Sequence, residues 1–298
     1  MKKWISLALI AVMVILAAGC QSEEKKVVIA SKPMAESYIV AEMMGQLIEA
    51  NSDIKVEYKM GIGGGTSNIQ PAMEAGEIDM YPEYTGTGWL FVLKNDLVTD
   101  PETLYEGVKS QYQEKFNFIW LDRYGFNNTY ALAIDKSKAD SMGINSFSDL
   151  AAQSGSLVLG SEYDFYERED GFPGLVAAYG FNFKETKELD IGLKYKAIGE
   201  GQVDVINNFS TDGLLAEYDL KVLKDDKNFF PAYEAATVIR QETLDKYPEL
   251  EAILNQLAGL ISDEEMQQMN YYVEKENRDA GDVAAEFLKA KGLLASND

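Results

Sequence analysis

The sequence predicts an α/β protein built from two α/β units. Short runs rich in β-branched residues alternate along the chain with segments whose apolar residues recur at helical spacing. This alternation occurs twice with different members, and at 298 residues the chain is longer than one typical domain. No stretch rich in Pro, Gly and Ser separates the two units, so we expect the chain to pass between them through strands rather than through a flexible linker.

The N-terminal residues MKKWISLALIAVMVILAAGC indicate an export signal. Two lysines precede an apolar run, residues 5–18, that is shorter than the ~20 residues of a membrane-spanning helix. The run ends in LAAGC, which resembles the lipobox of bacterial lipoproteins, where cleavage precedes the Cys and the Cys receives a lipid. We therefore expect residues 1–19 to be a signal peptide, Cys20 to be lipidated, and residues 20–26 to form a polar tether that holds the protein outside the cytoplasm on the cell membrane.

Composition excludes several kinds of site. Cys20 is the only cysteine, so we expect a fold without an internal disulfide. The sequence contains no His, which excludes imidazole base catalysis, the Ser-His-Asp arrangement and His-ligated metal sites. A net charge of -22 argues against nucleic acid as a partner. The same acidity would weakly favour cationic ligands, but a solvated acidic surface without functional meaning is the favoured interpretation.

The first unit begins directly after the tether. We expect, in chain order, a strand at residues 26–30, a helix at 34–50, a strand at 54–58, a helix at 67–75 and a strand at 78–81. The last of these strands leads into YPEYTGTG, whose tyrosines would then stand where open α/β sheets bind ligands.

The second unit contains different members of the same pattern. Strands are expected at residues 118–121, 129–134, 157–160 and 203–206, with a helix at 174–178. From residue 242 the chain is expected to be helical to its end. The segments 129–134 and 235–240 are the candidate crossings between the two units.

Several motifs of enzymes and cofactor sites fail on inspection. The loop GIGGGT, residues 61–66, has Thr66 where a dinucleotide-binding GxGxxG motif needs Gly. The acidic run at residues 163–170 lacks the alternating oxygen ligands of a calcium loop. No GxSxG, P-loop or paired-Cys zinc spacing is present, so we expect no enzyme activity, no cofactor and no metal. Acid-base catalysis by carboxylates alone is the remaining enzyme alternative.

Four aromatic residues stand at strand ends or turns with small or polar neighbours. They are Tyr84 in EYTGTG, Tyr130 in NNTYALA, Phe209 in NNFSTDG and Tyr233 in FFPAYEAA. Such positions are open to a ligand, although packing in the core is the alternative for each ring taken alone.

Five stretches together carry a family resemblance: ASKPMAESYIVAEMMGQLIE, GGTSNIQPAMEAGEIDMYPEYTGTG, NNTYALAI, GEGQVDVINNFSTDGLL and FFPAYEAATVI. In this order and spacing, the chain resembles the ProX-like substrate-binding proteins of osmoprotectant ABC transporters, which import glycine betaine, carnitine, choline and relatives. The resemblance implies a two-lobed periplasmic-binding-protein fold of type II with two crossover strands. One lobe would comprise residues 27–127 and 232–298, and the other residues 128–231.

The resemblance also implies the residues of the ligand site. The aromatic cage for a quaternary ammonium group would consist of Tyr84, Tyr130, Phe209 and Tyr233, and the ligand carboxylate would be held by Lys32, Thr87 and Arg168. Position 209 departs from the family, which more often has Tyr there, so a hydroxyl is lost while the ring remains. Without the resemblance, Arg168 would be interpreted as an ion-pair partner of Glu167, Glu169 or Asp170.

Elementary chemistry agrees with this assignment. A trimethylammonium group has no N–H to donate, so its site must use ring faces. A carboxylate at the other end of the ligand requires charge-assisted donors, which Lys32 and Arg168 would supply. Because choline has no carboxylate, we expect it to leave these two cations poorly compensated, and we rank betaines above it.

We therefore expect a monomeric, lipid-anchored receptor that delivers a betaine or carnitine to an ABC permease. Choline and ergothioneine, a bulkier betaine with a thioimidazole ring, remain alternatives within the same fold. A solute-sensing lipoprotein that reports to a signalling partner is the alternative of another class.

Overall fold

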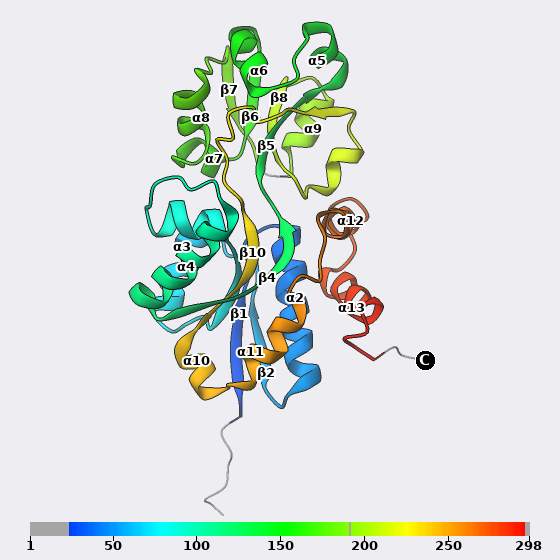
Figure 1. Cartoon of the computed structure of the whole chain (residues 1–298). Helices are drawn as coiled ribbons and strands as arrows, with labels where there is room; N and C mark the ends of the chain where they lie inside the picture. Colours follow the sequence, from blue (N-terminus) through cyan, green and yellow to red (C-terminus); the bar gives the residue numbers. More distant parts are fainter. Residues whose placement is uncertain (1–23, 191, 296–298) are drawn as a thin grey trace, which may run out of the picture.

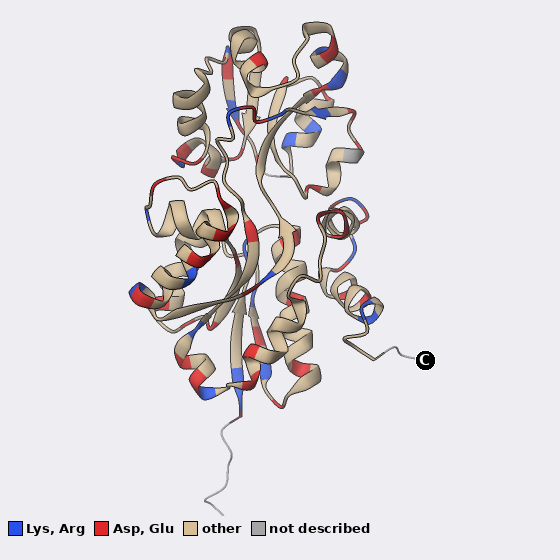
Figure 2. Cartoon of the chain, viewed as in Figure 1, with Lys and Arg blue, Asp and Glu red and all other residues tan. Residues whose placement is uncertain are grey.

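The computed structural model describes residues 24–190 and 192–295. The expected signal peptide and Cys20 lie outside the described residues. Within them, the chain forms two five-stranded sheets, each covered by helices, which stand one above the other in Figure 1. Acidic residues are spread over both lobes (Figure 2).

The first sheet has the strand order β2-β1-β3-β10-β4. Its strands are β1 (Lys26–Ala30), β2 (Lys55–Lys59), β3 (Met80–Tyr84), β4 (Phe118–Asn127) and β10 (Glu234–Arg240). Strands β1, β2 and β3 run parallel, whereas β10 is antiparallel to β3 and β4. Lobe 1 is therefore a mixed sheet whose fourth strand is supplied by the C-terminal part of the chain.

Helices cover both faces of this sheet. One face packs against α2 (Ala35–Asn51), α11 (Glu249–Leu254), α12 (Asp263–Glu274) and α13 (Ala280–Ala290). The other packs against α3 (Thr66–Glu74) and α4 (Pro101–Phe116), and α10 (Gln241–Lys246) follows β10. Figure 1 shows the two groups of helices on opposite sides of β1 and β10. Local chemistry sets the ends of α4, because Asp100 caps its N-terminus and Asn117 adopts the left-handed conformation after its last turn.

The second sheet has the order β7-β6-β8-β5-β9. Its strands are β5 (Tyr130–Asp135), β6 (Val158–Ser161), β7 (Glu185–Glu188), β8 (Val205–Phe209) and β9 (Leu220–Val222). The helices around it are α5 (Lys136–Met142), α6 (Phe147–Gln153), α7 (Tyr163–Glu167), α8 (Phe172–Tyr179) and α9 (Lys194–Gly199). Two apolar clusters pack around this sheet, so lobe 2 has its own core.

The chain passes between the sheets twice. Residues 128–129 join β4 to β5, and residues 223–233 join β9 to β10. The two connections run side by side, because the Asn128 backbone N–H donates to the Tyr233 carbonyl over 3.0 Å. The segments expected to cross, 129–134 and 235–240, instead form β5 and β10, each of which lies within one sheet directly after a crossing. The sequence pattern located the strands but not the few residues between them, where the chain leaves one sheet before it enters the next.

The expected lobe boundaries at 127/128 and 231/232 fall within these two connections. Helix α12 follows β10 and packs on lobe 1, but it also touches lobe 2. Its Asn270 side-chain amide donates to the backbone carbonyl of Thr211 over 2.9 Å. A helix assigned to one lobe therefore contributes to the contact between both.

Candidate functional site

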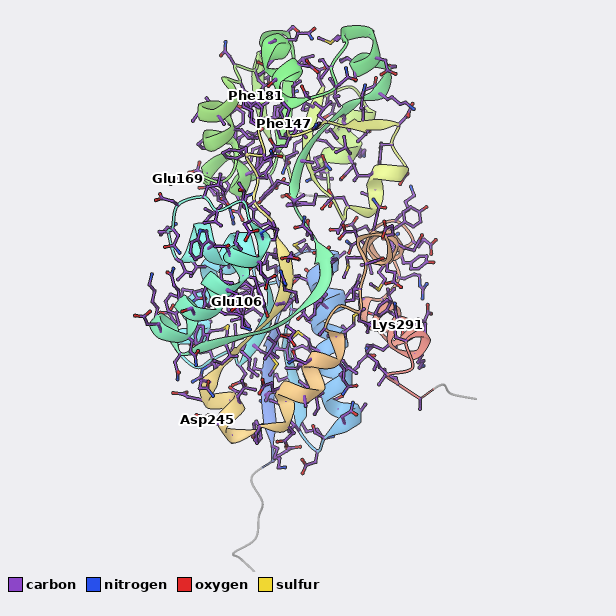
Figure 3. The ribbon with its side chains drawn as sticks, viewed as in Figure 1. Glu106, Phe147, Glu169, Phe181, Asp245 and Lys291 are labelled. Carbon is purple, nitrogen blue, oxygen red and sulfur yellow. The ribbon has the colours of Figure 1, made fainter. Side chains whose placement is uncertain are left out.

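A cavity of about 750 Å³ opens between the two lobes. It lies at the carboxyl ends of the parallel strands β1, β3, β6 and β8, where open α/β sheets bind ligands. Glu169, labelled in Figure 3, is among its lining residues. The seven ligand-binding residues expected from the sequence all line this cavity: Lys32, Tyr84, Thr87, Tyr130, Arg168, Phe209 and Tyr233.

Three of the expected cage rings are in direct contact. Tyr130, the first residue of β5, pairs across the sheet with Phe209, the last residue of β8. Their ring centres are 4.8 Å apart. Tyr233 meets the Tyr130 ring edge to face, with the centres 5.5 Å apart. Strand pairing thus places two rings side by side, and the crossing that leads into β10 brings the third.

Tyr84 joins this set from lobe 1. It ends β3 and is 5% exposed. Its hydroxyl donates to the Glu36 carboxylate over 2.5 Å. Burial, together with the neighbouring Glu36 charge, raises the pKa of Tyr84 well above its usual range, so the hydroxyl keeps its proton and remains a donor. Tyr81, the other tyrosine of YPEYTGTG, packs in the core on the opposite face of the sheet, because side chains three positions apart on a strand point to opposite sides.

Protein cations already lie near two of the cage rings. The Lys32 ammonium nitrogen is 4.6 Å from the centre of the Tyr84 ring. The ammonium nitrogen of the buried Lys194 is 4.8 Å from the centre of the Phe209 ring. These distances lie within the usual range for an ammonium over an aromatic face, so both rings already interact with a protein cation.

Lys32 forms an ion pair with the fully buried Glu83. Glu83 also accepts hydrogen bonds from the Thr66 hydroxyl over 2.7 Å and from the Tyr81 hydroxyl over 2.8 Å. Burial lowers the pKa of Lys32, and the Glu83 charge opposes this shift. The carboxylate therefore holds the lysine head group at the wall of the cavity, beside Tyr84.

Arg168 pairs with Asp170 through two hydrogen bonds, one of them from Nε over 2.8 Å. Its guanidinium carbon lies 4.9 Å from the centre of the Phe91 ring. The second oxygen of Asp170 also accepts a hydrogen bond from the Tyr233 hydroxyl over 2.9 Å. The interpretation of Arg168 as an ion-pair partner and its expected place at the ligand site are thus compatible, and the partner is Asp170.

These two ion pairs correct one expectation. The ranking of betaines above choline assumed that Lys32 and Arg168 face the ligand without compensation, but each has a carboxylate partner within the protein, Glu83 and Asp170. A ligand without a carboxylate would therefore leave neither cation unpaired. Both side chains nevertheless retain N–H groups beyond those used in the pairs, because an ammonium has three and a guanidinium five.

Four residues of this site were not expected there from the sequence: Glu36, Glu83, Phe91 and Asp170, the last of which was expected only as one of three possible partners of Arg168. One of them left a signal, because Glu83 is an acid within a strand of otherwise uncharged residues, MYPEY, all of which are buried. An acid in such a strand must find buried donors, as Glu83 does. The remaining three stand in segments where an acid or a ring is common at the surface.

Two negative findings concern the described residues. None of their helices has both the length and the apolar character needed to cross a membrane. Nowhere within residues 24–190 and 192–295 do three or more His, Cys, Asp or Glu side chains form a group that could hold a metal ion.

The family model described as the substrate binding domain of ABC-type glycine betaine transport systems matches residues 25–290. A Helicobacter pylori (strain G27) protein, an ergothioneine transport permease/ergothioneine binding protein, is 46% identical over 91% of this chain and 48% of its own length. This chain thus spans about half of that relative. The carnitine transport binding protein of Listeria monocytogenes is 37% identical over 90% of this chain and 87% of its own. A crystal structure of a glycine betaine/carnitine/choline ABC transporter protein superposes with a TM-score of 0.75 and 37% identity, covering 90% of this chain and 99% of the other.

Proposed function

We propose that this chain, which belongs to the family of substrate-binding domains of ABC-type glycine betaine transport systems, captures a quaternary ammonium solute outside the cytoplasm and delivers it to a membrane permease. The family consists of transport binding proteins rather than enzymes. Its members are extracytoplasmic, bind small molecules and work with a permease.

The observation that carries the proposal is the convergence of aromatic rings from both lobes on one cavity. Tyr84 comes from lobe 1, Tyr130 and Phe209 from lobe 2, and Tyr233 from the second crossing. Each ring face attracts a desolvated quaternary ammonium group by roughly 0.5 to 2 kcal/mol. Several ring faces together compensate for the hydration that the cation loses on binding. A quaternary ammonium group has no N–H, so its site needs no hydrogen-bond acceptor.

The other end of the ligand would lie against Lys32, Thr87 and Arg168. Glu83 and Asp170 hold the two basic side chains in place, and each basic side chain has N–H groups beyond those used in its ion pair, which a ligand carboxylate can accept from. A zwitterion adds no net charge to the cavity. We therefore assign glycine betaine, proline betaine and carnitine as the primary ligand class, and choline as a weaker ligand that lacks these hydrogen bonds.

The site is divided between the lobes, so binding and closure form one equilibrium. Tyr130, Phe209 and Arg168 belong to lobe 2, whereas Lys32 and Tyr84 belong to lobe 1. Separating the lobes would divide the cage and release the solute to the permease. The lipidated Cys20 would keep the receptor, working as a monomer, beside that permease.

Ergothioneine is a second candidate ligand. The cavity extends beyond the rings of the cage to Leu90, Phe91 and Leu97, which gives space for a bulkier betaine. A trimethylammonium group in the cage and a carboxylate at Arg168 would then leave the thioimidazole ring in this part of the cavity, which Lys94, Asn95 and Asp96 also line. The name of the Helicobacter pylori relative supports this candidate.

Titration calorimetry on the protein without residues 1–20 tests the proposal. Glycine betaine, carnitine, choline and ergothioneine are compared, with free glycine as the control that has a carboxylate but no methylated ammonium. Binding of a small betaine but not glycine supports the primary class, and binding of ergothioneine alone selects the second candidate. Binding of none of the four would overturn the proposal.

A further inference from the structure

The buried Glu36 carboxylate accepts hydrogen bonds from four different parts of the structure. Its Oε1 accepts from the Tyr84 hydroxyl over 2.5 Å and from the Asn128 amide over 2.7 Å. Its Oε2 accepts from the Thr211 hydroxyl over 2.6 Å and from the Asn270 amide over 3.3 Å. Glu36 is 1% exposed, so these side chains take the place of water around it.

The four donors belong to elements that are far apart in the sequence. Tyr84 ends β3 and is one of the proposed cage rings. Asn128 lies in the first crossing between the lobes, and Asn270 lies on α12. Thr211 belongs to lobe 2 and follows the cage residue Phe209 by two positions. A single carboxylate thus joins lobe 1, the first crossing, α12 and lobe 2.

The Thr211 contact is the one that spans the two lobes. Glu36 lies in the first turn of α2 and moves with lobe 1, whereas Thr211 follows β8 and moves with lobe 2. The Asn270 amide, which donates to Glu36, also donates to the Thr211 carbonyl over 2.9 Å. Separating the lobes at this point would remove two contacts and return a buried carboxylate to water.

The same carboxylate positions the Tyr84 ring. Of the two oxygens, Oε1 binds the ring hydroxyl and Oε2 binds lobe 2. Each oxygen also faces a side-chain amide N–H, from Asn128 or from Asn270. A Gln side chain at position 36 has the same shape but must place its own NH2 group opposite one of these donors, so at least one contact has to reverse.

We propose that Glu36 is a positioning residue that links lobe closure to assembly of the aromatic cage. The carboxylate holds the Tyr84 ring in place and, through Thr211, holds the lobe that carries Phe209 and Tyr130 against it. The role in ligand capture rests on the proposed function, while the role in closure does not. The consequence is that loss of this carboxylate shortens the lifetime of the closed complex rather than slowing its formation.

The test uses Glu36→Gln and Thr211→Val, with Thr237→Val as the matched control. Thr237 is also fully buried and its hydroxyl bonds Tyr124 over 2.7 Å, but both residues belong to lobe 1. Association and dissociation rates for glycine betaine and ergothioneine are measured by stopped-flow fluorescence. We expect dissociation at least threefold faster for Thr211→Val and at least tenfold faster for Glu36→Gln. Association should change less than twofold, and Thr237→Val should leave both rates within twofold of the unmodified protein.

A second measurement does not depend on the ligand. Spin labels at Glu106→Cys on α4 and Ala177→Cys on α8 report the distance between the lobes, in a protein without Cys20. We expect both variants to shift the ligand-free distances towards larger separations, unlike the control. If the unmodified protein binds none of the four solutes tested by calorimetry, the proposed function fails, and this shift alone decides the role in closure. If the unmodified protein binds a solute, unchanged dissociation rates in the two variants would overturn the role of Glu36. If it binds none, unchanged distances between the spin labels in the variants would do so.

Discussion

The Lys32 ammonium nitrogen lies 4.6 Å from the centre of the Tyr84 ring, while Glu83 pairs with the same ammonium. A ring of the proposed cage therefore already interacts with a protein cation. An approaching quaternary ammonium group meets repulsion from that cation, and only a ligand that also carries a carboxylate gains hydrogen bonds from Lys32 in return. Lys32 is accordingly placed to distinguish zwitterions from simple cations.

Replacement of Lys32 tests this distinction. In Lys32→Gln the positive charge is lost, while Glu83 keeps its hydrogen bonds from Thr66 and Tyr81. We expect choline to bind several-fold more tightly, because the uncompensated Glu83 attracts it, and glycine betaine to bind several-fold more weakly. Calorimetry with both ligands measures the ratio. Equal changes for the two would show that Lys32 supports the fold and not the ligand.

Removal of a cage ring tests the aromatic site. Tyr84→Ala and Tyr233→Ala each remove one face worth roughly 0.5 to 2 kcal/mol, so we expect affinity for every trimethylammonium ligand to fall by about 2- to 30-fold. Tyr272→Ala is the control. Tyr272 lies on α12, the centre of its ring is 4.9 Å from the guanidinium carbon of Arg278, and it is not among the residues that line the cavity. Affinities in the two cage variants that match the control would contradict the assignment.

Variants of Arg168 and Asp170 test whether Arg168 binds the ligand carboxylate or serves only as the ion-pair partner of Asp170. Arg168→Ala removes donors for a ligand carboxylate but also leaves Asp170, which is 8% exposed, without its partner. We expect betaine affinity to fall at least tenfold while choline affinity is retained. The double variant Arg168→Ala/Asp170→Asn removes both charges and should restore stability, measured as the unfolding temperature, but not betaine binding. Recovery of betaine binding in the double variant would show that Arg168 acts only as a partner of Asp170.

We expect Glu274, the last residue of α12, to contribute to the pH dependence of stability, although its side chain keeps an exposed surface. Burial, followed by the nearby Asp212 charge, raises the pKa of Glu274 to about 8. Between its unfolded value, ~4.3, and about 8 the native protein holds a proton that the unfolded chain has released, so stability falls as pH rises. Solvent still reaches this side chain, so we expect a modest effect.

Melting curves from pH 4 to pH 9 check this dependence in Glu274→Gln. The variant should match the unmodified protein near pH 4 and unfold at higher temperature above pH 8, because Gln never acquires the unfavourable charge. Glu276→Gln, which removes an acid two positions further along the chain and beyond the end of α12, serves as the control. A gain in unfolding temperature that is independent of pH, or is shared by Glu276→Gln, would contradict the assignment.

Much of the fold followed from local patterns. The expected strand at 26–30 corresponds to β1, and the expected helices at 34–50 and 67–75 correspond to α2 and α3 with shifts of one residue at their ends. The spacing of apolar residues and the residues that begin and end helices determine such elements, so they can be predicted from a single sequence. The crossings could not be located in this way, because residues 128–129 carry no pattern of their own. Their place is decided by which sheet each neighbouring strand joins.

Arg168 shows the same limit for the site. Three neighbouring acids could have paired with it, and the turn after α7 selected Asp170, whose second oxygen also receives the Tyr233 hydroxyl. Sequence distance could not distinguish the three acids. The pair matters for ligand choice, because it removes the argument that choline would leave Arg168 without a compensating charge.

The sequence by itself determined the α/β class and, through the family motifs, the residues that line the cavity between the lobes. Those features depend on spacing along the chain and on residue type, both of which are local. The tertiary structure alone decided how the charges are compensated: Glu83 beside Lys32, Asp170 beside Arg168, and Glu36 among donors from both lobes. Burial makes an unpaired charge costly, so the partner of each charge depends on which segments the fold brings within hydrogen-bond distance.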